Sequence, residues 1–135
     1  GGMISSLITS VPGSSAYFLG SVTSYANSVK TGVLGVPENV IEKYGAVSSE
    51  CVAAMAEGVR KLTGSDFSVA TSGIAGPGGG SEEKPVGLVW IAVSSQKGTE
   101  AFKLLFNSDR KRNIERFASS ALDTLRKKIE KELNH

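Results

Sequence analysis

The most informative segment of this chain is Ser68-Val-Ala-Thr-Ser-Gly-Ile-Ala-Gly-Pro-Gly-Gly-Gly-Ser-Glu-Glu-Lys-Pro-Val-Gly87. It begins as a strand, because Phe67, Val69 and Thr71 alternate with small or polar residues. Glycines then interrupt the pattern, and an almost continuous apolar run follows from Val86 to Val93. Such a run is typical of a strand that is buried on both faces. The stretch therefore predicts two core strands joined by a glycine-rich loop.

The loop from Gly73 to Gly80 exposes bare backbone N–H groups at the end of a strand, which lets a ligand approach closely. A mobile connection without any ligand explains the glycines equally well. Two nucleotide-binding fingerprints are excluded. No Lys-Ser or Lys-Thr pair follows the glycines at the spacing of a P-loop, and the loop leads into a strand rather than a helix.

Composition limits the chemistry that is available. The 135 residues suffice for one domain with a single core, and the net charge of +2 gives no strong nucleic-acid or membrane footprint. Cys51 is the only cysteine and His135 the only histidine, which excludes an internal disulfide and a Cys/His metal cluster. Any catalysis must then use Ser, Thr, Lys, Tyr or carboxylates, with no metal or other cofactor. Because no long apolar run or signal-peptide pattern is present, we expect a cytoplasmic protein.

The rest of the chain alternates helical and strand patterns. The predicted helices are 4–11, 28–34 with Asn27 as its cap, 37–44, one that Ser48 or Ser49 caps and Gly64 ends, and 108–133. The further predicted strands are 19–25 and 99–106. The last strand follows the second core strand after a short turn, which predicts an antiparallel hairpin. With enough helices to cover both faces, the pattern predicts an α/β fold, a three-layer α/β/α sandwich with a mixed sheet.

Two local arrangements are candidates for chemistry. Lys30 lies among apolar neighbours where a strand end leads into a helix, and loss of solvation there lowers the pKa of a lysine and frees a neutral amine to act as a base. The segment Asn107-Ser-Asp-Arg110 opens the last helix, where backbone N–H groups and an arginine can hold an anionic group. An ordinary surface lysine and a plainly capped helix are the simpler interpretations of these two segments.

Four segments together resemble the CinA C-terminal domain family, the competence/damage-inducible family whose active members are nicotinamide mononucleotide amidohydrolases. The segments are Val11-Pro-Gly-Ser-Ser-Ala-Tyr-Phe18, Ser24-Tyr-Ala-Asn-Ser-Val-Lys30, Tyr44-Gly-Ala-Val-Ser48 and Ser72-Gly-Ile-Ala-Gly-Pro-Gly-Gly-Gly-Ser-Glu-Glu-Lys-Pro-Val-Gly87. The match follows the whole chain in order, and the last string is highly specific. The resemblance implies a cytoplasmic bacterial enzyme that releases ammonia from the carboxamide of nicotinamide mononucleotide, needs no metal, and forms oligomers, commonly dimers.

The resemblance also implies a serine–lysine mechanism. It assigns catalytic roles to Lys30 as the general base, Tyr25 beside it, Ser72 as an assisting or substrate-binding hydroxyl, and Arg110. The residues that it places around the substrate are Gly1, Gly2, Asn27, Gly73, Ile74, Ala75, Gly76 and Pro77. Gly1 and Gly2 would form a cradle for an oxyanion or phosphate at a helix N-terminus, and the glycine-rich loop would wall the nucleotide.

The family's nucleophile is the serine of the motif A-E-S-C-T-G-G, and Gly1-Gly2 corresponds to the end of that motif. We therefore expect residues 1–135 to be a single domain of this family that lacks its N-terminal strand and helix, with the nucleophile outside the sequence. The alternative is that Gly1-Gly2 is the remnant of a tag before a genuine Met3. Ser5, Ser6, Ser14 and Ser15 lie nearby, but their spacing nominates none of them as a substitute.

Two other classes of function stay open at this stage. The first is a catalytically inactive nucleotide-sensing or protein-interaction domain that keeps the fold without the chemistry. The second is a nucleic-acid accessory protein, suggested by the basic residues of the last helix, which are Arg110, Lys111, Arg112, Arg126, Lys127 and Lys128. A solvated helix face explains these charges better, and the near-neutral balance disfavours nucleic acid as a partner.

Overall fold

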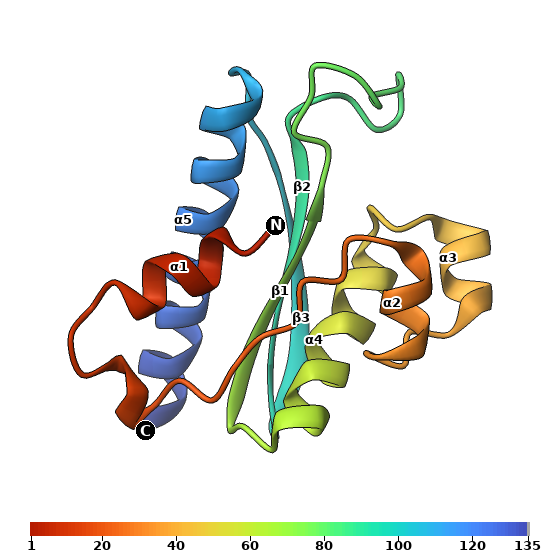
Figure 1. The fold of residues 1–135 in the computed structure, drawn as a ribbon. Helices are drawn as coiled ribbons and strands as arrows, with labels where there is room; N and C mark the ends of the chain where they lie inside the picture. Colours follow the sequence, from red (N-terminus) through yellow and green to blue (C-terminus); the bar gives the residue numbers. More distant parts are fainter. Residues whose placement is uncertain (135) are drawn as a thin grey trace.

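A computed structural model describes residues 1–134 and shows a three-stranded sheet between two layers of helices (Figure 1). In chain order the elements are α1 (Met3–Thr9), the 3-10 helix η1 (Ser14–Ala16), α2 (Asn27–Gly32), α3 (Glu38–Tyr44), α4 (Ser49–Thr63), β1 (Phe67–Gly73), β2 (Leu88–Ser95), β3 (Gly98–Leu105) and α5 (Arg110–Leu133). Helices α1 and α5 lie on one side of the sheet, and α2, α3 and α4 lie on the other. The predicted α/β/α layering is confirmed. None of the helices in residues 1–134 is long and apolar enough to cross a membrane.

The sheet has the order β1-β2-β3, and β2 pairs antiparallel with both neighbours. This corrects the expectation of a mixed sheet for the described part of the chain. The difference comes from residues 19–25, which were predicted as a strand but lie outside every described ladder. A strand forms only where a neighbour takes up its backbone hydrogen bonds. Val22 of this segment nevertheless packs against the core beneath α4.

The alternation of side chains along β1 sends its residues to two different cores. The hydroxyl of Ser68 donates a hydrogen bond of 2.6 Å to the carbonyl of Ala56 in α4, and Ala70 belongs to the α4-side core. Val69 packs instead against the core that contains Phe117 of α5. By the same alternation, Ser72 lies on the α4 face of the sheet.

The two long helices begin at the residues that capping rules favour. Ser48 caps α4, where its side chain accepts a hydrogen bond of 3.1 Å from the Cys51 amide. Asp109 caps α5 by accepting 2.9 Å from the Arg112 amide. The predicted cap at Asn27 is wrong. Ala26 holds the N-cap position in extended backbone and Asn27 is already helical, so its side chain caps nothing.

The end of α5 is fastened to the β2–β3 hairpin by a polar cluster. The ammonium of Lys128, whose side chain is only 6% exposed, contacts Glu132 at 2.9 Å and Glu100 at 3.0 Å. The Ser95 hydroxyl donates 2.8 Å to the Glu132 carboxylate. Burial alone would lower the pKa of Lys128, but the two carboxylates outweigh it and raise that pKa. A lysine that the charge pattern placed in water is therefore part of the packed structure.

This cluster predicts a loss of stability in acid. The hydrogen bond from Lys128, supported by Ser95, lowers the pKa of Glu132 below that of an unfolded glutamate, about 4.3. The resulting stabilisation is complete above the unfolded pKa and disappears as the pH falls through the lower folded pKa. Glu132→Gln should therefore lower Tm at neutral pH, and its difference from the wild type should narrow as the pH falls.

The control for that measurement is Glu115→Gln, which removes a negative charge from an exposed position of the same helix. It should leave the pH dependence of Tm unchanged. A constant Tm difference between Glu132→Gln and the wild type from neutral to acid pH would contradict the assignment.

Candidate functional site

Lys30 is the most unusual charged residue of the α4 side. It lies in the last turn of α2 and is 6% exposed, although α2 has only six residues. Its Nζ donates a hydrogen bond of 2.7 Å to the carbonyl of Ser24 and a longer one of 3.4 Å to that of Tyr25. No carboxylate in residues 1–134 forms an ion pair with it. The simpler interpretation of Lys30 as a surface lysine is therefore wrong.

Burial has opposite effects on the two groups at this position. Loss of solvation lowers the pKa of Lys30, and charge on the neighbouring Cys51 thiol only partly opposes that shift. Burial raises the pKa of Cys51, with Lys30 and Lys84 opposing the shift. The lysine is thus biased toward a neutral amine and the fully buried cysteine toward a protonated, unreactive thiol.

Tyr25 and Asn27 contribute less than their places in the sequence suggested. The side chain of Tyr25 is 79% exposed, so the structure brings its carbonyl rather than its phenol to Lys30. Asn27 is also exposed. Its carbonyl accepts a 3.4 Å hydrogen bond from the Thr31 hydroxyl within α2.

Ser72 lies near the end of β1, opposite Trp90 of β2, on the sheet face that α2 and α4 cover. Its side chain therefore faces the helix layer that contains Lys30. No hydrogen bond connects the two side chains among the described residues. Gly73 follows at once and has no room for a side chain, since a Cβ there would lie 2.8 Å from the Leu88 carbonyl oxygen. Only glycine therefore fits between Ser72 and the loop.

Residues 74–87 form the β1–β2 loop, which is closed at its base and held on both sides. The Ile74 amide donates 2.8 Å to the Leu88 carbonyl, and the Gly87 amide donates 2.7 Å to the Ile74 carbonyl. From the α3 side, the Lys84 ammonium donates 2.5 Å to the Tyr44 carbonyl. Within the loop Gly76 is buried, at a φ of +90°, and precedes the exposed Pro77.

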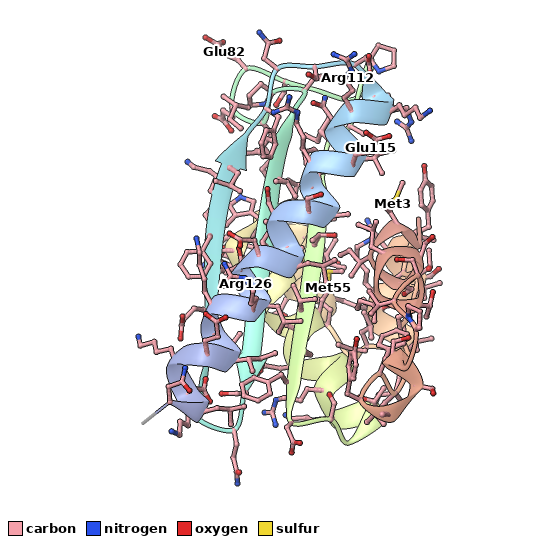
Figure 2. All side chains as sticks on the ribbon, turned by 90° about the vertical axis from the view of Figure 1, so that its left-hand side faces the viewer. Met3, Met55, Glu82, Arg112, Glu115 and Arg126 are labelled. Atoms are coloured by element: carbon pink, nitrogen blue, oxygen red, sulfur yellow. The ribbon has the colours of Figure 1, made fainter. Side chains whose placement is uncertain are left out.

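Arg110 and Asn113 hold the loop from the α5 side. The guanidinium of Arg110 donates 2.8 Å to the Gly76 carbonyl. The side-chain amide of Asn113 donates 3.0 Å to the carbonyl of the adjacent Ala75. Figures 1 and 2 both show the start of α5 and this loop at the same end of the sheet, where Figure 2 labels Arg112 and Glu82.

Asn113 is the residue that the sequence pattern missed. It lies four residues before Phe117, on the buried side of α5, and its own exposure is 0%. A polar residue at a buried position of an amphipathic helix was the available signal, since such residues are normally bonded to something specific.

Gly1 and Gly2 begin the described chain and are exposed. Gly2 is the N-cap of α1 at a φ of +95°, and a Cβ added there would lie 3.8 Å from the Thr23 hydroxyl oxygen. The predicted residues thus form two groups. Lys30, Tyr25, Asn27 and Ser72 lie on the α4 side, and the loop from Gly73 to Pro77 extends toward Arg110 at the start of α5.

Comparison with known proteins gives a consistent family. A model of the CinA C-terminal domain matches residues 1–129. The chain is 50% identical over 129 residues to a CinA-like protein of Endomicrobium trichonymphae and 46% identical over 129 residues to one of Geotalea uraniireducens. These matches cover 96% of this chain but only 30% and 31% of the two relatives, so the chain spans about a third of their length.

Solved structures share the fold. The competence damage-inducible protein A from Klebsiella pneumoniae superposes with a TM-score of 0.91 at 30% identity, covering 96% of this chain and 80% of that one. The competence/damage inducible protein from Agrobacterium tumefaciens gives a TM-score of 0.86 at 35% identity, covering 93% of this chain and 77% of that one.

Proposed function

The chain belongs to the CinA C-terminal domain family, and from that premise we propose that the protein carrying it is a nicotinamide mononucleotide amidohydrolase. The reaction converts the carboxamide of the nucleotide to a carboxylate and releases ammonia. The proposal rests on Lys30, which is buried and forms no ion pair within residues 1–134, and whose pKa is lowered by loss of solvation. This burial and lowered pKa are independent of the family match, because they come from the packing of Lys30 itself.

The hydrogen bonds of Lys30 suit a general base. A neutral amine has two N–H donors and one lone pair. The carbonyls of Ser24 and Tyr25 accept two hydrogen bonds from Nζ, which leaves the lone pair for an incoming proton. The positions of these carbonyls thus orient the amine as well as bury it.

In the proposed reaction Lys30 takes the proton of a serine hydroxyl while the serine oxygen bonds to the carboxamide carbon. The C–N bond then breaks, the nitrogen leaves as ammonia with the proton from Lys30, and an acyl-enzyme ester remains. Water attacks this ester with Lys30 again accepting a proton, which returns to the serine as the carboxylic acid product leaves. Backbone N–H groups stabilise the oxyanion of each tetrahedral intermediate.

We propose that the serine lies in a segment preceding Gly1, on a strand that enters the sheet beside β1. Two features support this placement. Within residues 1–134, β1 pairs only with β2, and residues 19–25 have no strand partner although Val22 packs on the same core. Several exposed apolar residues also lie in this part of the chain, where a further strand and helix would cover them: Leu7, Val11, Tyr17, Leu19 and Tyr25.

Arg110 is proposed to hold the phosphate of the nucleotide. Of its five N–H donors, one is directed to the Gly76 carbonyl, and no carboxylate in the described chain pairs with it. The contact with Gly76 fixes the guanidinium against the loop, so an anion bound there would lie between loop and helix. Backbone N–H groups of the glycines in the loop add neutral donors.

The function is tested with the full-length gene product and nicotinamide mononucleotide. We expect equal amounts of nicotinate mononucleotide and ammonia, measured by chromatography and an ammonia assay. Release of nicotinamide instead would mean cleavage of the glycosidic bond and would contradict the proposal. Tight binding of the nucleotide without turnover would favour the sensing domain.

A matched pair of arginines tests the phosphate site. Arg110 and Arg112 are both exposed in the first turn of α5, but only Arg110 contacts the loop. Arg110→Ala should raise KM for the nucleotide by about 10- to 100-fold, the usual worth of a hydrogen bond to a charged group, whereas Arg112→Ala should change KM by less than about threefold. Equal effects of the two substitutions would contradict the assignment.

A further inference from the structure

We propose that Asn113 is a positioning residue of this site, which keeps the β1–β2 loop and the start of α5 in one fixed arrangement. The inference deepens the proposed function and rests on it. Asn113 itself touches no reacting atom; it acts through the two segments that its amide group joins.

The contacts of Asn113 join parts of the chain that are distant in sequence. Its Nδ2 donates 3.0 Å to the carbonyl of Ala75 in the β1–β2 loop and 3.0 Å to the carbonyl of Ser108, which precedes α5. Both donors of the amide are therefore used. The residue is 0% exposed, so water does not compete for either bond.

The carbonyl oxygen of the Asn113 side chain indicates which property of this residue matters. The Oδ1 atom of Asn113 is buried and has no hydrogen-bond partner among residues 1–134. A buried acceptor without a partner destabilises the fold, and an aliphatic side chain would avoid that cost on this apolar side of α5. What an aliphatic residue could not supply is the pair of N–H donors that bind the Ala75 and Ser108 carbonyls.

These donors set the place of Arg110. Arg110 lies one turn before Asn113, and the two side chains bind the adjacent carbonyls of Gly76 and Ala75. The buried amide of Asn113 fixes the separation between α5 and the loop. At that separation the exposed guanidinium of Arg110 reaches the Gly76 carbonyl. Without Asn113, the loop and the helix start can separate, and a misplacement of about 1 Å at a substrate-holding group can cost a factor of about 10² in rate.

The test uses Asn113→Asp, which keeps the shape of the side chain but replaces the donating NH2 group with an oxygen, in the full-length protein. The matched control is Ala121→Gly, at a fully buried position two turns further along α5, which weakens the helix but removes no hydrogen bond to the loop. Both proteins are compared by amide hydrogen exchange and by kcat and KM. Asn113→Ser, which keeps one donor, replaces Asn113→Asp if that variant does not fold.

In the Asn113 variant we expect the amides of Ile74 and Gly87, which close the base of the loop, to exchange at least about tenfold faster relative to the central β1–β2 ladder. We also expect kcat/KM to fall by about 10- to 100-fold, mostly through KM, because Arg110 loses its frame. In Ala121→Gly, the amide exchange rates of the loop base and of the β1–β2 ladder should rise by the same factor. Its kcat/KM, corrected for the folded fraction, should stay within about twofold of the wild type.

Two results would overturn the inference. One is that, in the Asn113 variant, the amides of Ile74 and Gly87 exchange no faster relative to the β1–β2 ladder than in the wild type. The other is that its kcat/KM equals that of Ala121→Gly. The exchange measurement needs no substrate. If the wild-type protein releases no ammonia, the proposed function is lost, while the exchange comparison still decides whether Asn113 holds the loop.

Discussion

Replacement of Lys30 with methionine is expected to lower kcat/KM for nicotinamide mononucleotide by a factor of about 10² to 10⁴, the usual contribution of a positioned general base. Methionine keeps an unbranched apolar stem in the buried position but cannot accept a proton. The loss should fall mainly on kcat, because the amine acts on the reacting groups rather than on substrate affinity. Steady-state kinetics of ammonia release by the full-length gene product measures it.

The control for Lys30 is Lys61→Met, which makes the same chemical change at an exposed position of α4. Its kcat/KM should stay within about twofold of the wild type. Lys30→Met also leaves the Ser24 carbonyl without its donor, so the folded fraction of each variant is measured by circular dichroism. A loss smaller than about tenfold in folded Lys30→Met would contradict a general-base role.

Substitution of Gly87 is expected to give the largest loss of stability. Gly87 joins the β1–β2 loop to β2 at a φ of +94°, and a Cβ there would lie 1.7 Å from the Phe106 carbonyl oxygen. The clash is with backbone, which cannot rotate away as a side chain can. Since the Phe106 amide also donates 2.9 Å to the Gly87 carbonyl, the strand ends would have to separate. Gly87→Ala should therefore lower the free energy of unfolding by about 3 kcal/mol or more.

The same loop supplies the control for Gly87. Gly78 has an ordinary φ and no atom within 4 Å of a Cβ placed there. Gly78→Ala should change the free energy of unfolding by less than about 1 kcal/mol, and can raise it by restricting the unfolded chain. Urea denaturation of both variants gives the comparison. Similar stabilities for the two variants would contradict the close approach at Gly87.

The features that were correctly predicted from sequence are those that depend on local patterns. Helix α4 ends before Gly64 as predicted, and of the two predicted caps, Ser48 and Ser49, it is Ser48 that holds the N-cap position. The β2–β3 hairpin follows from two strand patterns and a short turn. The burial of Lys30 was only one of two interpretations of its apolar neighbours, and the simpler one was a surface lysine; its packing beside the Ser24 and Tyr25 carbonyls decides between them.

The features that were missed depend on contacts between distant segments. Residues 19–25 have the composition of a strand, but pairing depends on a neighbour that composition does not identify. The basic residues of α5 were expected on a solvated face, but Lys128 is buried because Glu100 and Glu132 receive its charge. Asn113 was detectable as a polar residue on the buried side of α5, but its partner, the Ala75 carbonyl, lies in a loop 38 residues away and was not predictable from the pattern.

The pH dependence of kcat/KM for nicotinamide mononucleotide, measured on the full-length gene product, decides whether Lys30 acts as a neutral base. Burial lowers the pKa of Lys30, so the neutral amine becomes the main form at a lower pH than for an ordinary lysine. We predict that kcat/KM rises with pH and reaches its plateau well below the ordinary lysine value of about 10.4, and that residual activity in Lys30→Met lacks this rise. A rise that continues to about pH 10.4, or the same rise in Lys30→Met, would mean that Lys30 is not a general base with a lowered pKa.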